Sequence, residues 1–238
     1  MKNAVVRLRN RVEKRLVNLA TTRILNHQNA SRIFALYEGA EYARQHMQSA
    51  QGFDNKNEVR LAALGAAPRA GIVAEFGVWS GRTINMIADH FGEGVIVHGF
   101  DSFEGLPEDW NDQYRKGAFH TQGSLPAVRS NVTLHKGWFE DTVPPFSAAN
   151  MGEPVALLHI DCDLYSSTKT VFDALGGNLV AGSVILFDEY FNYPEWREHE
   201  YKAFQELVEA RSLKYRYLSY NQHEWNAAVQ ITDIGSSG

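Results

Sequence analysis

The sequence predicts an α/β domain with a mostly parallel sheet. Five short apolar runs of strand length lie between residues 71 and 189, separated by segments of helical or loop character. Their near-continuous apolar character is typical of strands that are buried on both faces of a parallel sheet. A chain of 238 residues is also long enough for one well-buried domain and short for two.

The first 65 residues are expected to be helical and to form a lid or an oligomerisation segment, with the main domain over residues 66–238. Residues 1–30 carry seven Lys/Arg and one acid, a charge of +6. Because the whole chain has a net charge of −5, the remaining residues carry −11. Apolar side chains recur there at helical spacing, at Val5, Leu8, Val12, Leu16 and Leu19. This pattern favours an amphipathic helix that packs on its own domain or on a second subunit; the alternative is an anionic membrane surface.

The elements of the main domain follow a turn at residues 65–71. Crossover helices are expected at 82–91 and 166–180, and two longer strands around a polar turn, an antiparallel edge pair, within 214–232. With that pair the sheet would have seven strands. The five buried strands are expected at 71–77, 94–101, 131–137, 154–161 and 182–189.

Composition narrows the classes of function. The net charge of −5 gives no general reason to expect nucleic-acid binding. No apolar run approaches the roughly 20 residues that span a bilayer, so stable membrane insertion is not expected. The single cysteine, Cys162, cannot form an internal disulfide, which suits a cytoplasmic protein.

Acidic residues end four of the five predicted strands. Because ligands of open α/β sheets bind beyond the carboxyl ends of the strands, these acids are expected to converge on one site. The acids are Glu75, Asp101, Asp161 and the pair Asp188–Glu189.

The stretch EFGVWSG (residues 75–81) has the composition of a strand, a glycine turn and a helix start. Gly77 and Gly81 permit positive φ and let a ligand lie against the main chain, and the helix start favours an anionic group. Asp101, 26 residues after Glu75, can accept hydrogen bonds from both hydroxyls of a ribose. In HKGWFEDT (135–142), Trp138 and Phe139 either flank a planar ring or pack as core, and the sequence does not decide between them.

The stretch LLHIDCDLYSS (157–167) carries two aspartates around Cys162. If the strand continues past residue 161, Asp161 and Asp163 point the same way, about 6–7 Å apart, and Cys162 points to the other face. Clustered carboxylates repel one another unless protons or a cation neutralise them, and oxygen ligands favour Mg²⁺ or a similar ion. Neighbouring carboxylates disfavour a thiol nucleophile at Cys162, and His159 is expected to be a satisfied core residue.

The segments EFGVWSG, GFDSFEGLPEDW, HIDCDLYSST and ILFDEY, in this order, resemble the macrocin O-methyltransferase family over roughly residues 70–205. The resemblance implies a Rossmann-like class I methyltransferase fold that uses S-adenosylmethionine and Mg²⁺. It implies Asp161, Asp188 and Glu189 as metal ligands and Asp163 as a candidate base, with Glu189 standing where the family commonly has Asp. The cofactor residues expected are Glu75, Gly77, Gly81, Thr83, Asp101, Ser102, Phe103, Gly137, Trp138, Phe139 and Asp161.

The function expected is therefore metal-assisted O-methylation of a hydroxyl on a sugar or a glycosylated natural product. Residues 188–201 are expected to form part of the acceptor wall, and their aromatic residues suit a sugar or a planar aglycone. A homodimer or higher oligomer through the N-terminal helices is possible. The alternatives are a catechol-type O-methyltransferase, an NAD-dependent oxidoreductase and a non-catalytic partner protein that binds a cofactor.

Overall fold

The protein is known from a computed structural model that describes residues 11, 14–15, 18, 26–111 and 113–235. Its core is one eight-stranded sheet in the order β1-β7-β8-β6-β5-β2-β3-β4. The neighbours β6, β5, β2, β3 and β4 are all parallel, whereas β8 is antiparallel to both β6 and β7. The strands are β1 (Gln51–Phe53), β2 (Ile72–Phe76), β3 (Val97–Asp101), β4 (Val132–Lys136), β5 (Val155–Ile160), β6 (Val184–Phe187), β7 (Leu213–Asn221) and β8 (Ala227–Ile234).

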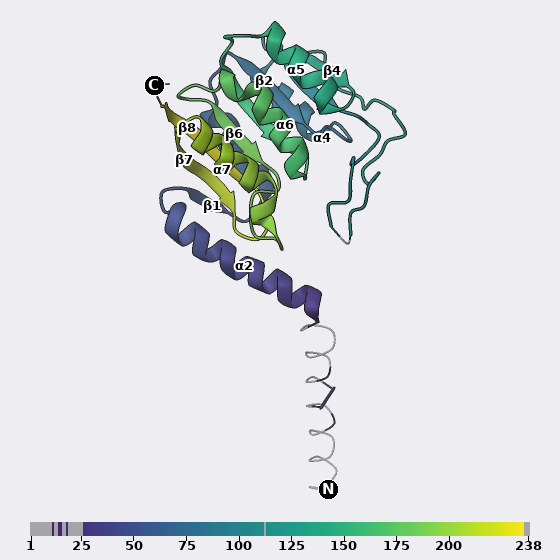
Figure 1. Ribbon diagram of the computed structural model, residues 1–238, viewed down its shortest axis with the longest axis vertical. Helices are drawn as coiled ribbons and strands as arrows, with labels where there is room; N and C mark the ends of the chain where they lie inside the picture. The colour runs from purple at the N-terminus through teal and green to yellow at the C-terminus, as the bar shows by residue number, and fades with distance from the viewer. Residues whose placement is uncertain (1–10, 12–13, 16–17, 19–25, 112, 236–238) are drawn as a thin grey trace.

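Helices cover both faces of the sheet, as the apolar strands predict. One face carries α5, α6 and α7, which lie over the sheet toward the viewer in Figure 1, and the other carries α3 and α4. Each face has its own apolar core, so β2, β5 and β6 are buried throughout. The helices are α2 (His27–His46), α3 (Lys56–Ala66), α4 (Arg82–Phe91), α5 (Phe139–Ala149), α6 (Tyr165–Leu175) and α7 (Glu200–Ala210), with 3₁₀ turns η2 (Gly176–Asn178) and η3 (Trp196–Glu198).

The parallel sheet with its antiparallel pair confirms the fold class, but two details differ from the prediction. The sheet has eight strands rather than seven, because Gln51–Phe53 in the supposedly helical N-terminal region pairs in parallel with Ser219–Asn221. This short strand forms backbone hydrogen bonds with the outer edge of β7. The sequence had predicted that the antiparallel pair would end the sheet. An unexpected helix, α5, also follows β4.

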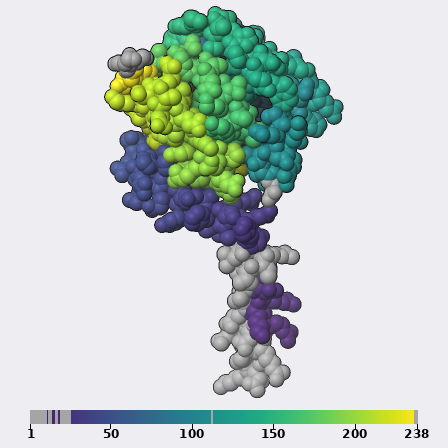
Figure 2. All heavy atoms as spheres, in the orientation of Figure 1, coloured from purple at the N-terminus to yellow at the C-terminus, as the bar shows by residue number. Residues whose placement is uncertain are grey.

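The N-terminal helix α2 lies against the C-terminal part of the chain (Figure 2). The Tyr42 hydroxyl lies 2.6 Å from that of Tyr217, and the Tyr42 ring meets Trp196 edge-on. The basic amphipathic helix expected around Val5–Leu19 lies outside the described residues. The domain boundary expected at residue 65 remains a prediction. In the part of the chain that the structure describes, no helix has the length and apolarity to cross a bilayer.

Candidate active site

A cavity of about 600 Å³ lies beyond the carboxyl ends of β2, β3, β5 and β6. This is the edge of the sheet at which the acidic strand ends were expected to meet. Four of these acids, Asp101, Asp161, Asp188 and Glu189, line the cavity together with Asp163. Strand order and parallel direction thus bring together residues that are up to 88 positions apart in the chain.

The turn after β2 forms one wall. Gly77 has φ +94°, and a Cβ there would lie 1.8 Å from the Asp161 carbonyl oxygen, so only glycine fits between the two strand ends. Helix α4 begins after Gly81 (φ +78°) without a side-chain cap, which leaves its first N–H groups available.

Asp101 fixes this turn in place. Its Oδ2 accepts hydrogen bonds from the N–H groups of Val78 and Trp79, both at 2.8 Å, and its Oδ1 accepts one from Phe103 at 2.6 Å. Each carboxylate oxygen has two lone pairs, so Oδ1 keeps the capacity for one further donor. The residue that the sequence assigned to a ribose therefore also orders the main chain of the cavity wall.

Most of the expected cofactor residues line this cavity. They are Gly77, Thr83, Asp101, Ser102, Gly137, Trp138, Phe139 and Asp161. Three do not line it. Gly81 lies behind the wall against Pro126, Phe103 is 1% exposed in the core under α4, and Glu75 is fully buried beneath the cavity.

Trp138 and Phe139 are half-buried at the start of α5. Both line the cavity, and the Phe139 ring also meets Phe76 edge-on at 5.8 Å between centroids. Phe139 is thus a core contact that also faces the cavity, and the flanking of a planar ring by either residue stays a prediction.

Asp163 reaches the site by a route that the sequence did not predict. Strand β5 ends at Ile160, and Asp163 has φ +64°, a left-handed conformation that aspartate tolerates better than most residues. The condition that the strand continues past residue 161 is therefore not met. The left-handed turn nevertheless keeps the Asp163 carboxylate near Asp161 and Glu189.

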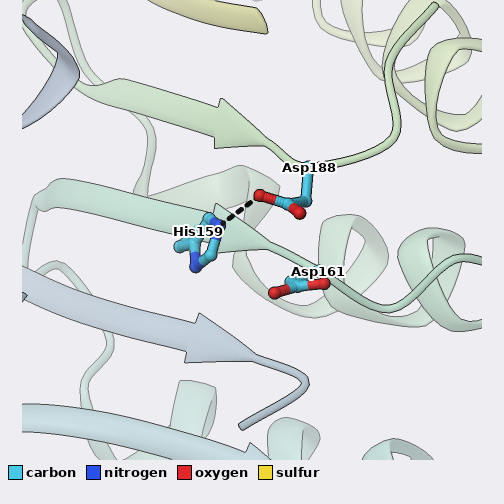
Figure 3. Close-up of side chains that lie close together, drawn as sticks. All are labelled: His159, Asp161 and Asp188. Atoms are coloured by element: carbon cyan, nitrogen blue, oxygen red, sulfur yellow. Dashed lines mark ion pairs between the residues drawn. The ribbon is translucent and has the colours of Figure 1, made fainter. Parts of the chain in front are cut away.

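Glu75 and Asp188, here called the paired acids, have cationic partners. Asp188 Oδ1 lies 2.6 Å from Arg60 Nη2 and 3.6 Å from His159 Nε2, and His159 Nδ1 lies 3.0 Å from Glu75 Oε2. All four side chains are buried. Figure 3 shows His159 and Asp188 facing each other across the ends of β5 and β6, with Asp161 beside them.

These contacts set the charges of the paired group. Burial by itself lowers the pKa of His159, but the carboxylates of Asp188 and Glu75 outweigh it and raise the pKa to about 10. Burial also raises the pKa of Asp188, but His159 and Arg60 hold that pKa below its ordinary value. Asp188 is therefore ionised between two cations. His159 is a buried residue as expected, yet it is part of an ion network.

Asp161, Asp163, Glu189 and Glu200, here called the unpaired acids, have no ion-pair partner among the described residues. Burial raises the pKa of Asp163 to about 7, with the nearby Asp188 charge adding to the effect. Burial and neighbouring carboxylates also raise the pKa values of Asp161, Glu189 and Glu200. This group therefore retains protons or takes up a cation.

The donor set fits a hard divalent ion. Oxygens of Asp161, Asp163 and Glu189 all lie within 4.8 Å of one another, and the Glu189 Oε2 atom is buried without a hydrogen-bond partner. A second set within the same spacing joins His159, Asp161 and Asp188. Asp161 and Glu189 belong both to the ligand set implied by the family and to the first set.

Two residues of the site were missed by the sequence reasoning. Arg60 comes from α3, inside the supposed helical lid, and Glu200 from the first turn of α7, where its Oε2 accepts a hydrogen bond from the Glu189 N–H at 3.2 Å. The sequence carried no local signal for either, because a charged residue on a helix usually faces solvent.

Cys162 borders the cavity but packs its side chain in the apolar core. Its thiol is buried in the core under α6, 3.4 Å from the Thr168 hydroxyl, and burial raises its pKa well above the ordinary value. A protonated, buried thiol is a poor nucleophile.

Comparison with known proteins agrees with this geometry. Residues 74–190 match a family described as a methyltransferase domain. The chain is 30% identical over 157 residues to demethyldecarbamoylnovobiocin O-methyltransferase of Streptomyces niveus, covering 56% of this chain and 58% of the relative. It is 31% identical over 142 residues to a tetracenomycin-type 4′-O-methyltransferase of Streptomyces olivaceus that acts on a dimethoxyrhamnosyl compound, covering 50% and 53%.

The chain thus spans little more than half the length of these curated relatives. Among solved structures, a calicheamicin methyltransferase superposes with a TM-score of 0.54 at 21% identity, covering 93% of this chain and 91% of that one, which shows a shared fold. The matched domain and the named relatives are methyltransferases, which agrees with the resemblance seen in the sequence motifs.

Proposed function

Because residues 74–190 carry a methyltransferase domain, we propose that this protein transfers a methyl group from S-adenosylmethionine to a hydroxyl of a sugar or a glycosylated natural product. The observation that carries the proposal is a cavity lined by the glycine turn, Asp101, Asp161, Asp163 and Glu189. The curated relatives methylate hydroxyls of glycosylated antibiotics, which supports the same class of acceptor.

The cofactor half is assigned to the turn after β2 and to the ends of β3 and β4. The free lone pair of Asp101 would accept a hydrogen bond from a ribose hydroxyl, and the uncapped start of α4 would bind the amino-acid carboxylate. Trp138 and Phe139, which line the cavity, would hold the adenine. Glu75, Gly81 and Phe103 act indirectly, by supporting this wall.

The acceptor half is assigned to the ends of β5 and β6. When bound, S-adenosylmethionine supplies the methyl group and a divalent ion lowers the pKa of the acceptor hydroxyl. Asp161 and Glu189 hold the ion, with Asp188 as the third ligand implied by the family. Asp163 would take the proton from the hydroxyl, since its carboxylate lies beside those of Asp161 and Glu189.

We also expect a cytoplasmic homo-oligomer. The single buried cysteine suits a reducing compartment. Helix α2 exposes a run of large apolar side chains, Ile33, Phe34, Leu36 and Tyr37, between 41% and 66% exposed, which suits association with a second copy.

The test is a methyl-transfer assay with S-adenosylmethionine, a panel of vicinal-diol glycosides and a panel of catechols. We expect S-adenosylhomocysteine and a methylated glycoside by mass spectrometry, and loss of turnover in Asp161→Ala with cofactor binding retained. If only catechols are methylated, the acceptor is a catechol rather than a sugar or a glycoside. Full turnover after metal removal with excess EDTA would remove the ion from the mechanism.

A further inference from the structure

We propose that the third carboxylate ligand of the divalent ion in this chain is Asp163 rather than Asp188, so that Asp161, Asp163 and Glu189 hold the ion. The inference rests on the metal assistance proposed above and changes its ligand set. Asp188 is instead the partner of Arg60.

The geometry of the three acids favours this set. Their oxygens lie within 4.8 Å of one another, and an octahedral Mg²⁺ site places ligand oxygens up to about 4.2 Å apart, twice the metal–oxygen distance. Small side-chain rotations therefore close the site. The left-handed backbone of Asp163 (φ +64°) turns this carboxylate toward the other two.

Glu189 supplies a vacant buried oxygen. The residue is 7% exposed, and its Oε2 has no hydrogen-bond partner. Its main chain is fixed from both sides, because its N–H donates to Glu200 Oε2 and its carbonyl accepts from the Tyr193 hydroxyl at 3.1 Å. An unsatisfied buried carboxylate oxygen is costly unless a cation or a proton completes it.

Asp188 is already neutralised. The Arg60 guanidinium lies 2.6 Å from Oδ1, and the two side chains are only 4% and 9% exposed. The main-chain carbonyl of Asp188 accepts from Asn226 Nδ2 at 3.0 Å, which holds the residue in this position. A divalent ion bound to the same carboxylate would stand next to a buried positive charge in a weakly screened environment.

The second close set, His159 with Asp161 and Asp188, is less suitable. Its Asp188 carboxylate is already paired with Arg60, and its His159 already contacts Glu75 through Nδ1. Nitrogen is also a poor ligand for Mg²⁺ compared with carboxylate oxygen.

Calorimetric titration of the full chain with Mn²⁺, without acceptor, tests the ligand set independently of turnover. We expect Asp163→Asn to weaken Mn²⁺ binding by about ten-fold or more, because it removes a charged ligand. Arg60→Gln should bind Mn²⁺ more tightly than wild type, because a nearby positive charge is removed. The double variant R60Q/D188N, which removes both members of the ion pair, should bind Mn²⁺ close to wild type.

The double variant is the matched control, since Asp188→Asn alone leaves the Arg60 charge buried and unpaired. Loss of Mn²⁺ binding in R60Q/D188N would overturn the proposal, whether or not Asp163→Asn also loses Mn²⁺ binding. So would wild-type binding by Asp163→Asn, or no binding of Mn²⁺ to the wild type. Titration of each variant with S-adenosylmethionine separates these outcomes from failure of the proposed function, which predicts cofactor binding whichever acids hold the ion.

Discussion

The paired and unpaired acids lie at the same edge of one sheet, yet they are neutralised differently. Asp188 and Glu75 have Arg60 and His159 within ion-pair distance. Asp161, Asp163, Glu189 and Glu200 have raised pKa values and no such partner among the residues described. The paired acids have protein cations as partners, which suits a role in shaping the site. The unpaired acids lack such partners, which suits the binding of a metal ion.

Removal of Arg60 is the largest expected change in stability. Arg60→Met leaves Asp188 buried with only the more distant His159 as a cation, and breaking a buried ion pair costs about 3 kcal/mol of unfolding free energy. Urea denaturation followed by tryptophan fluorescence measures this. The double variant R60M/D188N is the control and should recover most of the loss. Equal stability of Arg60→Met and wild type would mean that the pair is not formed.

The pH dependence of stability should differ between the unpaired acids and Asp188. The unpaired acids have folded pKa values above their unfolded values of about 4, so from about pH 4 upward the unfolded chain binds fewer protons than the folded one. Their contribution therefore falls as the pH rises, through about pH 7 for Asp163. Asp188 has a lowered folded pKa, so its contribution is present above about pH 4 and is lost only at lower pH.

Melting temperatures between pH 5.5 and 8 measure this difference. In EDTA, the melting temperature of the wild type should fall with rising pH, because the unpaired acids and His159 all hold protons more tightly in the folded chain. Asp163→Asn should show a shallower fall, and the difference from wild type isolates the contribution of Asp163. Mg²⁺ should stabilise the wild type more at pH 8 than at pH 5.5, because the ion replaces protons. A Mg²⁺ effect that does not depend on pH would contradict the division into two groups.

The smallest effect is expected at Cys162, which lies between the two aspartates in sequence and packs its thiol in the apolar core. Cys162→Ala should leave kcat close to wild type and lower the unfolding free energy by about 1 kcal/mol, because a small buried side chain is shortened. Steady-state kinetics and urea denaturation measure the two quantities. Loss of turnover in a folded variant would restore the thiol as a candidate nucleophile.

The sequence predicted the acidic strand ends of the site better than their surroundings. Asp161, Asp188 and Glu189 were expected to meet because buried parallel strands end at one edge of the sheet. The left-handed turn at Asp163 was not expected, since a two-residue alternation presumes that the strand continues. Arg60 and Glu200 could not be predicted, because the packing of α3 and α7 on the sheet determines which of their side chains face the site.

The glycine turn shows the same limit. Positive φ at Gly77 was expected, and the structure has it, but the close neighbour of its missing Cβ is the main chain of Asp161. Likewise Glu75 was expected at the cofactor and lies under the cavity as the partner of His159. Local patterns predict conformations well, whereas which residue a side chain contacts depends on the order of strands.

The most direct test of the central claim is calorimetric titration of the wild-type chain with S-adenosylmethionine, with NADH as the competing ligand class. We predict binding of one S-adenosylmethionine per chain and none of NADH. Asp101→Asn should weaken the binding, whereas Asp173→Asn, a change at an exposed carboxylate outside the cavity, should leave it unchanged. Binding of NADH in place of S-adenosylmethionine, or binding of S-adenosylmethionine that Asp101→Asn leaves untouched, would contradict the account.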